Sequence, residues 1–314
     1  MNILRKAVHD YLALRRSLGF KLTRHQAELP KFADFLAKRR ARHLTTALAL
    51  EWATQHAHHQ PFTWACRLSR VRGFARYWSA TDPLTEIPPL GLLPCRPPRA
   101  HAYFYSDEEI RRLLRAAKSR PSHHPLQPWT YYCFFGLLAV TGLRLSEALN
   151  LRIGDVDWSE NILTIRDTKF GKTRLVPLHP STRKVLAAYA KRRDRLFTTR
   201  AETHFFVNQN GNRLDKGEVH RTFYTLSRRI GLRAPSASRG PRLHDFRHRF
   251  AIETLLRWYR NGRDPKRCLP ILATYLGHAH VTDTYWYLTG TPELLGAAGK
   301  RLEKRWEVRN AKRR

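Results

Sequence analysis

The sequence has few cysteines, few acidic residues and no long apolar run, and each shortage excludes a class of protein. Its four cysteines, at positions 66, 95, 133 and 268, form no Cys-x-x-Cys pair, which argues against a disulfide framework and favours a reducing compartment. The longest apolar run, Cys133–Val140, is far shorter than the roughly 18 residues of a membrane-spanning helix. The N-terminus becomes charged at Arg5 and lacks the apolar segment of a signal peptide, so we expect a cytoplasmic protein.

Acidic residues are outnumbered by basic ones throughout the chain. The 58 Lys and Arg against 25 Asp and Glu give a net charge of +33 and a pI near 11.0. Residues 1–98 hold 16 basic and 6 acidic residues, a net +10, and the remainder holds 42 and 19, a net +23. A chain that is basic over its whole length predicts a nucleic acid bound by both halves, although a ribosome-associated protein or a solvated basic surface also fits.

Proline divides the chain into two regions. The length of 314 residues favours two domains, and the proline-rich segment after Ile87 is unsuited to a helix or a central strand. We therefore expect a helical domain over 1–98, a linker region over 88–104 and a second domain over 104–314.

Apolar residues recur at helical spacing in the first domain. Three apolar stripes predict three helices, over residues 4–18, 29–36 and 64–78. The first stripe ends at Leu18. The last helix has four arginines on its other face: Arg67, Arg70, Arg72 and Arg76. We expect Arg67 and Arg70 to contact the DNA backbone, with a merely solvated face as the alternative.

The second domain is predicted to be mainly helical with a small antiparallel sheet. Ser106-Asp-Glu-Glu109 has the pattern of a capping box that opens a helix through Lys118, and the apolar run over 126–141 predicts a buried helix. Three short β-type runs follow, at 155–158, 162–166 and 174–178. Further helices are expected at 180–194, 216–230, 243–261, 265–277 and 292–308.

Five short motifs of this domain have residue types suited to phosphate chemistry. They are Thr141-Gly-Leu-Arg-Leu-Ser-Glu147, Thr168-Lys-Phe-Gly-Lys-Thr-Arg174, His244-Asp-Phe-Arg247, Leu276-Gly-His278 and Tyr287. Each motif alone has an ordinary structural explanation, such as a surface arginine or a charged helix face. In this order and spacing, over about residues 104–306, they resemble the tyrosine recombinase/integrase family, which includes phage integrases and Xer resolvases.

The resemblance implies six catalytic residues: Arg144, Lys169, His244, Arg247, His278 and Tyr287. Two arginines suit a phosphodiester because their permanently charged guanidinium groups bind its non-bridging oxygens and stabilise the transition state. The histidines titrate near neutrality, and a lysine on a turn protonates the leaving 5′-oxygen. Lys172 is the alternative to Lys169 for that role, and we expect Lys172 and Arg174 also to contact DNA.

Two tyrosines are candidates for the nucleophile. The spacing that the family has between the Leu-Gly-His histidine and the tyrosine selects Tyr287, and Tyr285 is then expected to pack as a core or interface aromatic.

The implied reaction cuts and rejoins specific DNA sites through a transient 3′-phosphotyrosyl bond, without ATP, a cofactor or a metal. Glu147, one turn after Arg144, is expected to orient that arginine. Two alternatives remain: a type IB topoisomerase that relaxes supercoils, and a catalytically inactive DNA-binding protein on the same fold. His244-Asp-Phe-Arg-His248 has the His spacing of a zinc-binding helix, but no third ligand follows it.

The family also implies an architecture and partners. Its two domains form a C-shaped clamp on opposite faces of double-stranded DNA, and four copies assemble on paired sites, either as a homo-tetramer or with co-encoded recombinases. The amphipathic segment Leu294–Trp306 is predicted to dock on a neighbouring copy. The segment around Tyr287 looks closer to integrases of mobile genetic elements than to housekeeping resolvases, so we expect a nucleoid-associated recombinase of such an element, with integration, excision, resolution and transposition all open as its role.

Overall fold

A computed structural model describes residues 3–94, 102–166, 173–198, 203–237, 239–289 and 292–311. Contacts within the chain divide it into two compact units, residues 1–100 and 101–314. The predicted linker region lies partly outside the described residues. Each unit is therefore described by itself.

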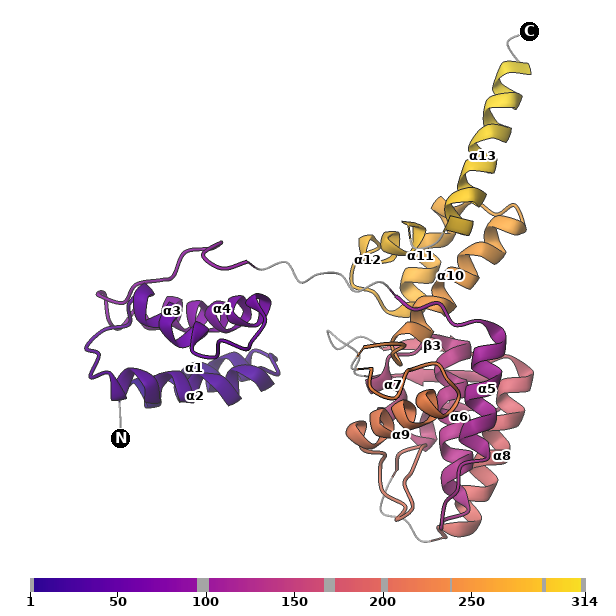
Figure 1. The fold of residues 1–314 in the computed structure, drawn as a ribbon, viewed down its shortest axis with the longest axis horizontal. Helices are drawn as coiled ribbons and strands as arrows, with labels where there is room; N and C mark the ends of the chain where they lie inside the picture. Colours follow the sequence, from indigo (N-terminus) through magenta and orange to yellow (C-terminus); the bar gives the residue numbers. More distant parts are fainter. Residues whose placement is uncertain are drawn as a thin grey trace. The chain divides into compact units, whose positions relative to one another are not determined.

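The first unit is a small helical bundle (Figure 1, indigo). It consists of α1 (Ile3–Ser17), α2 (Thr23–Lys38), α3 (Thr46–Thr54) and α4 (Pro61–Trp78). Its core contains fully buried aromatic rings from α2 and α4, including Phe32 and Phe74. The spacing of apolar residues correctly predicted α1, α2 and α4, but α3 was not predicted, and Leu18 lies beyond the end of α1 and is 64% exposed.

The arginines of α4 that we expected on DNA make contacts inside this unit. Arg67 is buried; its Nη2 donates to the carbonyl of Trp52 at 2.8 Å, and its guanidinium lies over the Trp52 ring. Arg70 pairs with Glu28 at 2.6 Å. Since α2 and α3 already supply their partners, these positions fit a role in holding the bundle together better than a DNA contact. The sequence could not distinguish the two because the partners of Arg67 and Arg70 lie on other helices, whereas Arg76 on the same face of α4 is exposed.

The second unit is mainly helical and contains the central helix α6 (Leu126–Thr141). Before it comes α5 (Asp107–Lys118), whose start has the predicted capping box between Ser106 and Glu109. Against α6 pack α5, α8 (Pro180–Leu196) and α10 (Asp245–Arg260). Most apolar residues of α6 are buried, as its composition predicted, although Val140 is 51% exposed. The remaining helices are α7 (Leu145–Asn150), α9 (Lys216–Arg229), α11 (Pro265–Leu276), α12 (Thr282–Tyr285) and α13 (Pro292–Ala311), with 3₁₀ turns at Ile153–Asp155 and Trp286–Thr289.

A three-stranded antiparallel sheet follows α7 in the chain. Its strands are β1 (Val156–Asp157), β2 (Ile162–Ile165) and β3 (Arg174–Pro177), in the order β1-β2-β3. Ile165 pairs with Arg174, so the segment between them connects two neighbouring strands. The expectation of a mainly helical fold with a small antiparallel sheet is confirmed.

A second apolar cluster joins the last helices of this unit. Leu255 of α10, Leu272 and Leu276 of α11 and Leu294 of α13 are buried together with Tyr287. The cluster fixes α11 and the segment after it against α10, which brings the last motifs of the sequence to the first turn of α10.

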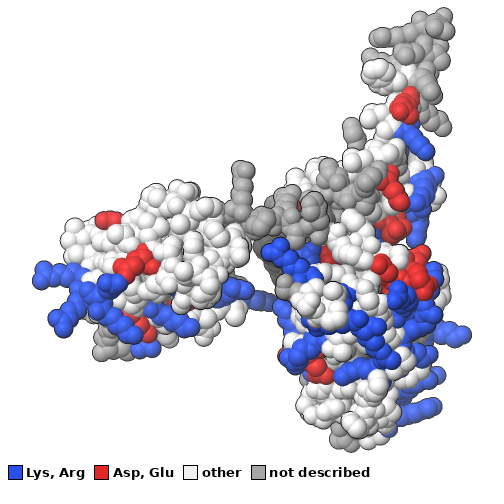
Figure 2. All heavy atoms as spheres, viewed as in Figure 1, with Lys and Arg blue, Asp and Glu red and all other residues white. Residues whose placement is uncertain are grey.

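Basic side chains gather along the lower side of the first unit in this view and over the body of the second, with fewer acidic ones among them (Figure 2). Among the described residues, no helix is long and apolar enough to cross a membrane.

Candidate active site

Arg144 is positioned by the sharp end of helix α6. Gly142 ends that helix in the left-handed conformation, with φ +62°, and Arg144 then caps the start of α7. Its Nη1 donates to Oε1 of Glu147 at 2.8 Å, as we expected from their spacing, and its Nη2 donates to the carbonyl of Gly277 at 3.0 Å. The side chain is 23% exposed, so part of this cation remains open to solvent.

Arg247 lies in the first turn of α10 and is almost completely buried. Its Nη1 donates to the carbonyl of Gly142 at 3.0 Å and its Nη2 to that of Leu276 at 2.6 Å. Burial lowers the pKa of Arg247 to about 10, with a smaller contribution from the nearby charge of Arg144. The group therefore still carries its charge at neutral pH, next to a second cation.

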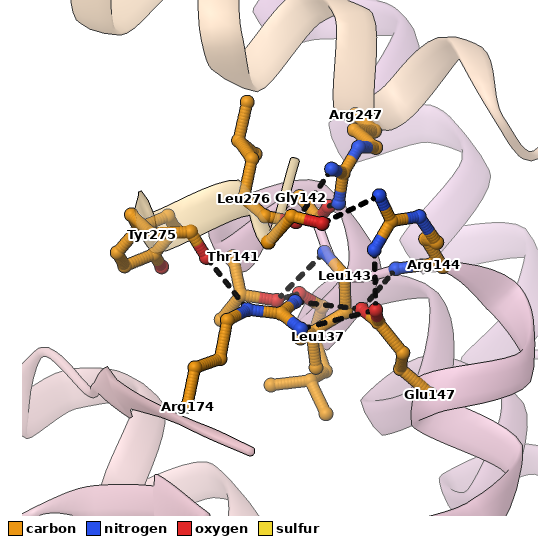
Figure 3. A network of polar contacts seen from close by, with 11 residues as sticks. Leu137, Thr141, Gly142, Leu143, Arg144, Glu147, Arg174, Arg247, Tyr275 and Leu276 are labelled. Atoms are coloured by element: carbon orange, nitrogen blue, oxygen red, sulfur yellow. Dashed lines mark hydrogen bonds and ion pairs between the residues drawn. The ribbon is translucent and has the colours of Figure 1, made fainter. Parts of the chain in front are cut away.

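The end of α11 brings three arginines together (Figure 3). The consecutive carbonyls of Tyr275, Leu276 and Gly277 accept hydrogen bonds from Arg174 Nε, Arg247 Nη2 and Arg144 Nη2, at 2.7, 2.6 and 3.0 Å. A helix C-terminus has partial negative charge and unpaired carbonyls, so it favours cations. The three guanidinium groups thus hold the turn that immediately precedes His278.

His278 is held by Thr284, a fully buried residue of α12. The ring Nδ1 lies 2.8 Å from Thr284 Oγ1, which leaves Nε2 as the nitrogen free of that contact. Burial, with the charges of Arg247 and Arg144, lowers the pKa of His278 to about 4. The imidazole is therefore neutral at pH 7 and able to accept a proton.

Tyr287 lies beside this histidine, and the two rings are stacked with centroids 6.1 Å apart. It is 3% exposed, whereas Tyr285 is 51% exposed. Tyr285 is thus not a core residue of this unit, and of the two roles we expected for it only that of an interface aromatic stays a prediction. Burial raises the pKa of Tyr287, and a hydrogen bond and charge from Arg247 partly oppose this shift.

Two histidines on α10 complete the described part of the site. His244, at the start of the helix, is exposed, and its ring lies 4.7 Å from that of His248. The His248 ring lies 5.6 Å from the Tyr287 ring, and burial together with His244 lowers the pKa of His248 to about 4. We had considered His248 only as a zinc ligand. Its spacing of four residues from His244 was the available indication that both side chains share one face.

Lys169 and Lys172 lie outside the described residues, so their positions stay predictions.

Arg174, which we expected to contact DNA, points inward instead. Its Nη1 and Nη2 donate to the two carboxylate oxygens of Glu147 at 3.0 and 2.7 Å, and its side chain is 9% exposed. Within the described ranges, no group of three or more His, Cys, Asp or Glu side chains is placed to hold a metal ion.

Comparison with known proteins identifies the family. Residues 104–293 match the phage integrase family. The chain is 56% identical over 313 residues to a Sinorhizobium fredii protein assigned as integrase/recombinase y4rB, a match that covers 98% of this chain and all of that protein. The fold is similar to that of the Tn1549 transposon integrase in complex with transposon right end DNA. That match has a TM-score of 0.66 and 16% identity, and covers 95% of this chain and 98% of the integrase.

A lambda integrase tetramer bound to a Holliday junction also has a similar fold. Its TM-score is 0.60 at 17% identity, over 90% of this chain and 76% of that one. The chain therefore belongs to the phage integrase family. It is a tyrosine recombinase, an enzyme that transfers DNA strands in site-specific integration and recombination.

Proposed function

We propose that this enzyme cuts and rejoins DNA through a transient 3′-phosphotyrosyl bond formed by Tyr287. The phenolic oxygen attacks the scissile phosphorus, the bond to the 5′-oxygen breaks, and that oxygen leaves as a hydroxyl after gaining a proton. The new ester keeps the energy of the broken bond. A 5′-hydroxyl from a second strand then attacks the same phosphorus and releases the tyrosine.

The observation that supports this proposal is the convergence of Arg144, Arg247, His278 and Tyr287 at the end of α11. Arg247 is close enough to hydrogen-bond Tyr287, and the charge of Arg144 also acts on this phenol. Two fixed cations next to a phenol are suited to the charge that develops on a five-coordinate phosphorus.

Burial shifts the pKa values of the groups that would exchange protons at this site. The raised pKa of Tyr287 keeps the phenol protonated at neutral pH, so attack needs a base. His278 is neutral and adjacent, and His244 is exposed at the start of α10, where the charges of Arg247 and Arg144 act on it. We assign His278 and His244 to proton transfer or phosphate binding, and Lys169, with Lys172 as the alternative, to protonating the 5′-oxygen.

Double-stranded DNA is the proposed substrate, bound by both units. The first domain, 1–98, would contact one face of the duplex and the domain over 104–314 the other, joined by the linker region at 88–104. Because Tyr287 is 3% exposed, its phenol must become accessible before it attacks. Four copies on two sites are the proposed assembly, as in the lambda integrase tetramer, and integration of a mobile element is the proposed role.

A trapping experiment tests this function. Duplexes that bind the Tyr287→Phe protein are selected from a random-sequence library, then nicked near the cleavage site so that the released 5′-fragment diffuses away. Wild type, Tyr287→Phe and Tyr285→Phe are incubated with these duplexes in EDTA and separated on a denaturing gel. We expect a covalent band with wild type and Tyr285→Phe and none with Tyr287→Phe.

Other outcomes assign the chain differently. A band that survives in Tyr287→Phe moves the nucleophile to another residue. Binding without a band from wild type indicates an inactive DNA-binding protein. Relaxation of supercoiled plasmid that lacks any selected site indicates topoisomerase activity instead of site-specific exchange.

A further inference from the structure

Arg174 is the arginine of the site that the reaction proposed above does not use. It is the first residue of β3, two residues after Lys172 in the sequence. All three of its terminal nitrogens donate hydrogen bonds to residues of this unit: Nε to the carbonyl of Tyr275, and Nη1 and Nη2 to Glu147. These bonds use three of the five N–H donors of the guanidinium, and at 9% exposure the side chain presents little surface to a DNA backbone.

Glu147 is shared between Arg174 and Arg144. Its Oε1 accepts from Arg144 Nη1 and Arg174 Nη1, and its Oε2 accepts from the Arg144 backbone amide and Arg174 Nη2. The side chain is only 4% exposed, and four hydrogen bonds use the acceptor capacity of a carboxylate. Burial alone would raise the pKa of Glu147, but the bonds and charge from Arg174, and then those from Arg144, lower it, so the group stays ionised.

The sharing has a consequence for Arg144. With Arg174 in place, Glu147 binds Arg144 through one side-chain nitrogen, and the other nitrogen donates to Gly277. Without Arg174, both carboxylate oxygens of Glu147 would be available to form a bidentate salt bridge with the Arg144 guanidinium. Two parallel hydrogen bonds are the favoured geometry for an arginine and a carboxylate. Such a pair would turn Arg144 away from Gly277 and would reduce the positive charge available to a phosphate.

The Arg174 side chain also holds the end of α11. Its bond to the Tyr275 carbonyl lies one residue before the bond of Arg247 to Leu276 and three residues before His278. Gly277 has φ +67°, and a Cβ there would lie 2.9 Å from Arg174 Nη1, so this guanidinium is packed directly under the turn.

We propose that Arg174 is a positioning residue that fixes Arg144, through Glu147, and the α11 turn before His278, and that it does not contact DNA. The inference rests on the proposed function and adds a third arginine to it. It also gives β3, the strand that follows Lys169 and Lys172 in the sequence, a direct tie to the phosphate-binding arginines.

The test measures covalent adduct formation in single turnovers on the nicked selected duplex, across DNA concentrations, with the full chain. Arg174→Met removes the guanidinium but keeps the apolar stem, and Arg174→Lys keeps the charge. We expect Arg174→Met to lower the rate at saturating DNA by about 10- to 100-fold while the half-saturating DNA concentration stays within about twofold. Arg174→Lys should restore part of that rate, because an ammonium can still bind Glu147.

Two further measurements separate positioning from other roles. In the Tyr287→Phe background, loss of Arg174 should leave the salt dependence of DNA binding unchanged, whereas loss of a phosphate contact would flatten its log–log slope by about one. In the Arg144→Lys background, Arg174→Met should cost much less than in wild type, since both changes act on one contact. Arg166→Met is the matched control: Arg166 follows β2, pairs with Asp155 and has no bond to Glu147, so its saturating rate should equal that of wild type.

The outcomes distinguish this inference from the proposed function. An adduct with wild type and an unchanged saturating rate in both Arg174 variants overturns the inference alone. A raised half-saturating concentration with a flatter salt slope also overturns it, in favour of a DNA contact. If Arg174→Met does not fold, as its melting curve would reveal, Arg174→Lys still decides, measured both alone and in the Arg144→Lys background. No adduct from wild type overturns the proposed function and this inference with it.

Discussion

Arg144 and Gly277, which are 133 positions apart in the sequence, are joined by a hydrogen bond of 3.0 Å from Nη2 to the carbonyl oxygen. The bond connects the first motif of the catalytic unit to the turn that precedes His278. Because Leu276 and Tyr275 bind Arg247 and Arg174 in the same way, one helix end determines where all three cations lie.

Replacing Arg144 with lysine should lower the single-turnover rate of adduct formation by about 100-fold or more. Lysine keeps the charge but cannot bind Glu147, Gly277 and a phosphate oxygen from one planar group. Arg257→Lys is the control, because Arg257 is exposed on α10, and it should react at the wild-type rate. Equal rates for all three proteins would contradict a role of Arg144 in catalysis.

Gly277→Ala should reduce both stability and activity. Its φ of +67° strains any residue with a Cβ, at a cost of about 1 kcal/mol, and the new Cβ would lie 2.9 Å from Arg174 Nη1. Gly262→Ala has the same φ but meets nothing within 4 Å, so it should lose only the stability. Urea unfolding and the trapping assay measure the two effects, and an equal loss of adduct in both variants would argue against displacement of Arg174.

Thr284→Val should slow adduct formation by about tenfold with little change in DNA affinity. Valine keeps the volume of threonine but removes the oxygen 2.8 Å from His278 Nδ1, so the ring loses the contact that orients it. The exposed Thr282 of the same short helix supplies the control, Thr282→Val, which should leave the rate unchanged. Gel-shift titration and single-turnover trapping together check this, and a normal rate for Thr284→Val would refute it.

Stability should fall as the pH is lowered from about 6.5 towards 5. The pKa values of His248 and His278 are lowered to about 4 in the folded state from 6.5, so in this range the unfolded chain binds more protons than the folded one. Because stability rises with pH wherever the unfolded state binds more protons, acidification favours unfolding. Urea unfolding across this range should have a shallower pH dependence in His278→Asn and the full dependence in the exposed loop control His123→Asn.

Assembly on paired sites should depend on the outer face of α13. Leu294 of this helix is buried against the unit, but Leu302 and Trp306 are 60% and 71% exposed. Replacing both exposed residues with serine should weaken the complex that joins two DNA duplexes and leave adduct formation on one duplex intact. Gel filtration of the protein with paired duplexes measures the first effect. An unaltered paired complex would exclude these side chains from the interface.

The sequence by itself determined most of the local structure. Apolar spacing, the Ser106 capping box and the glycine after Thr141 predicted the main helices and the sheet, because these signals act between residues within a few positions of one another. The order of the motifs likewise predicted the family and the residues Arg144, Arg247, His278 and Tyr287 as candidates. Short elements such as α3 and α7 were missed because six to nine residues give too few repeats of a pattern.

Only the tertiary structure decided which cations face inward. From the sequence we predicted that three arginines contact DNA: Arg67, Arg70 and Arg174. In the structure their partners lie on other elements of the fold and are Trp52, Glu28 and Glu147, respectively. The burial of Tyr287 and the place of His248 beside it likewise depend on how α10 packs against the segment after α11. The charge of a side chain and its spacing in the sequence specify what it can bind. Long-range packing determines which of those partners lies next to it in the folded chain.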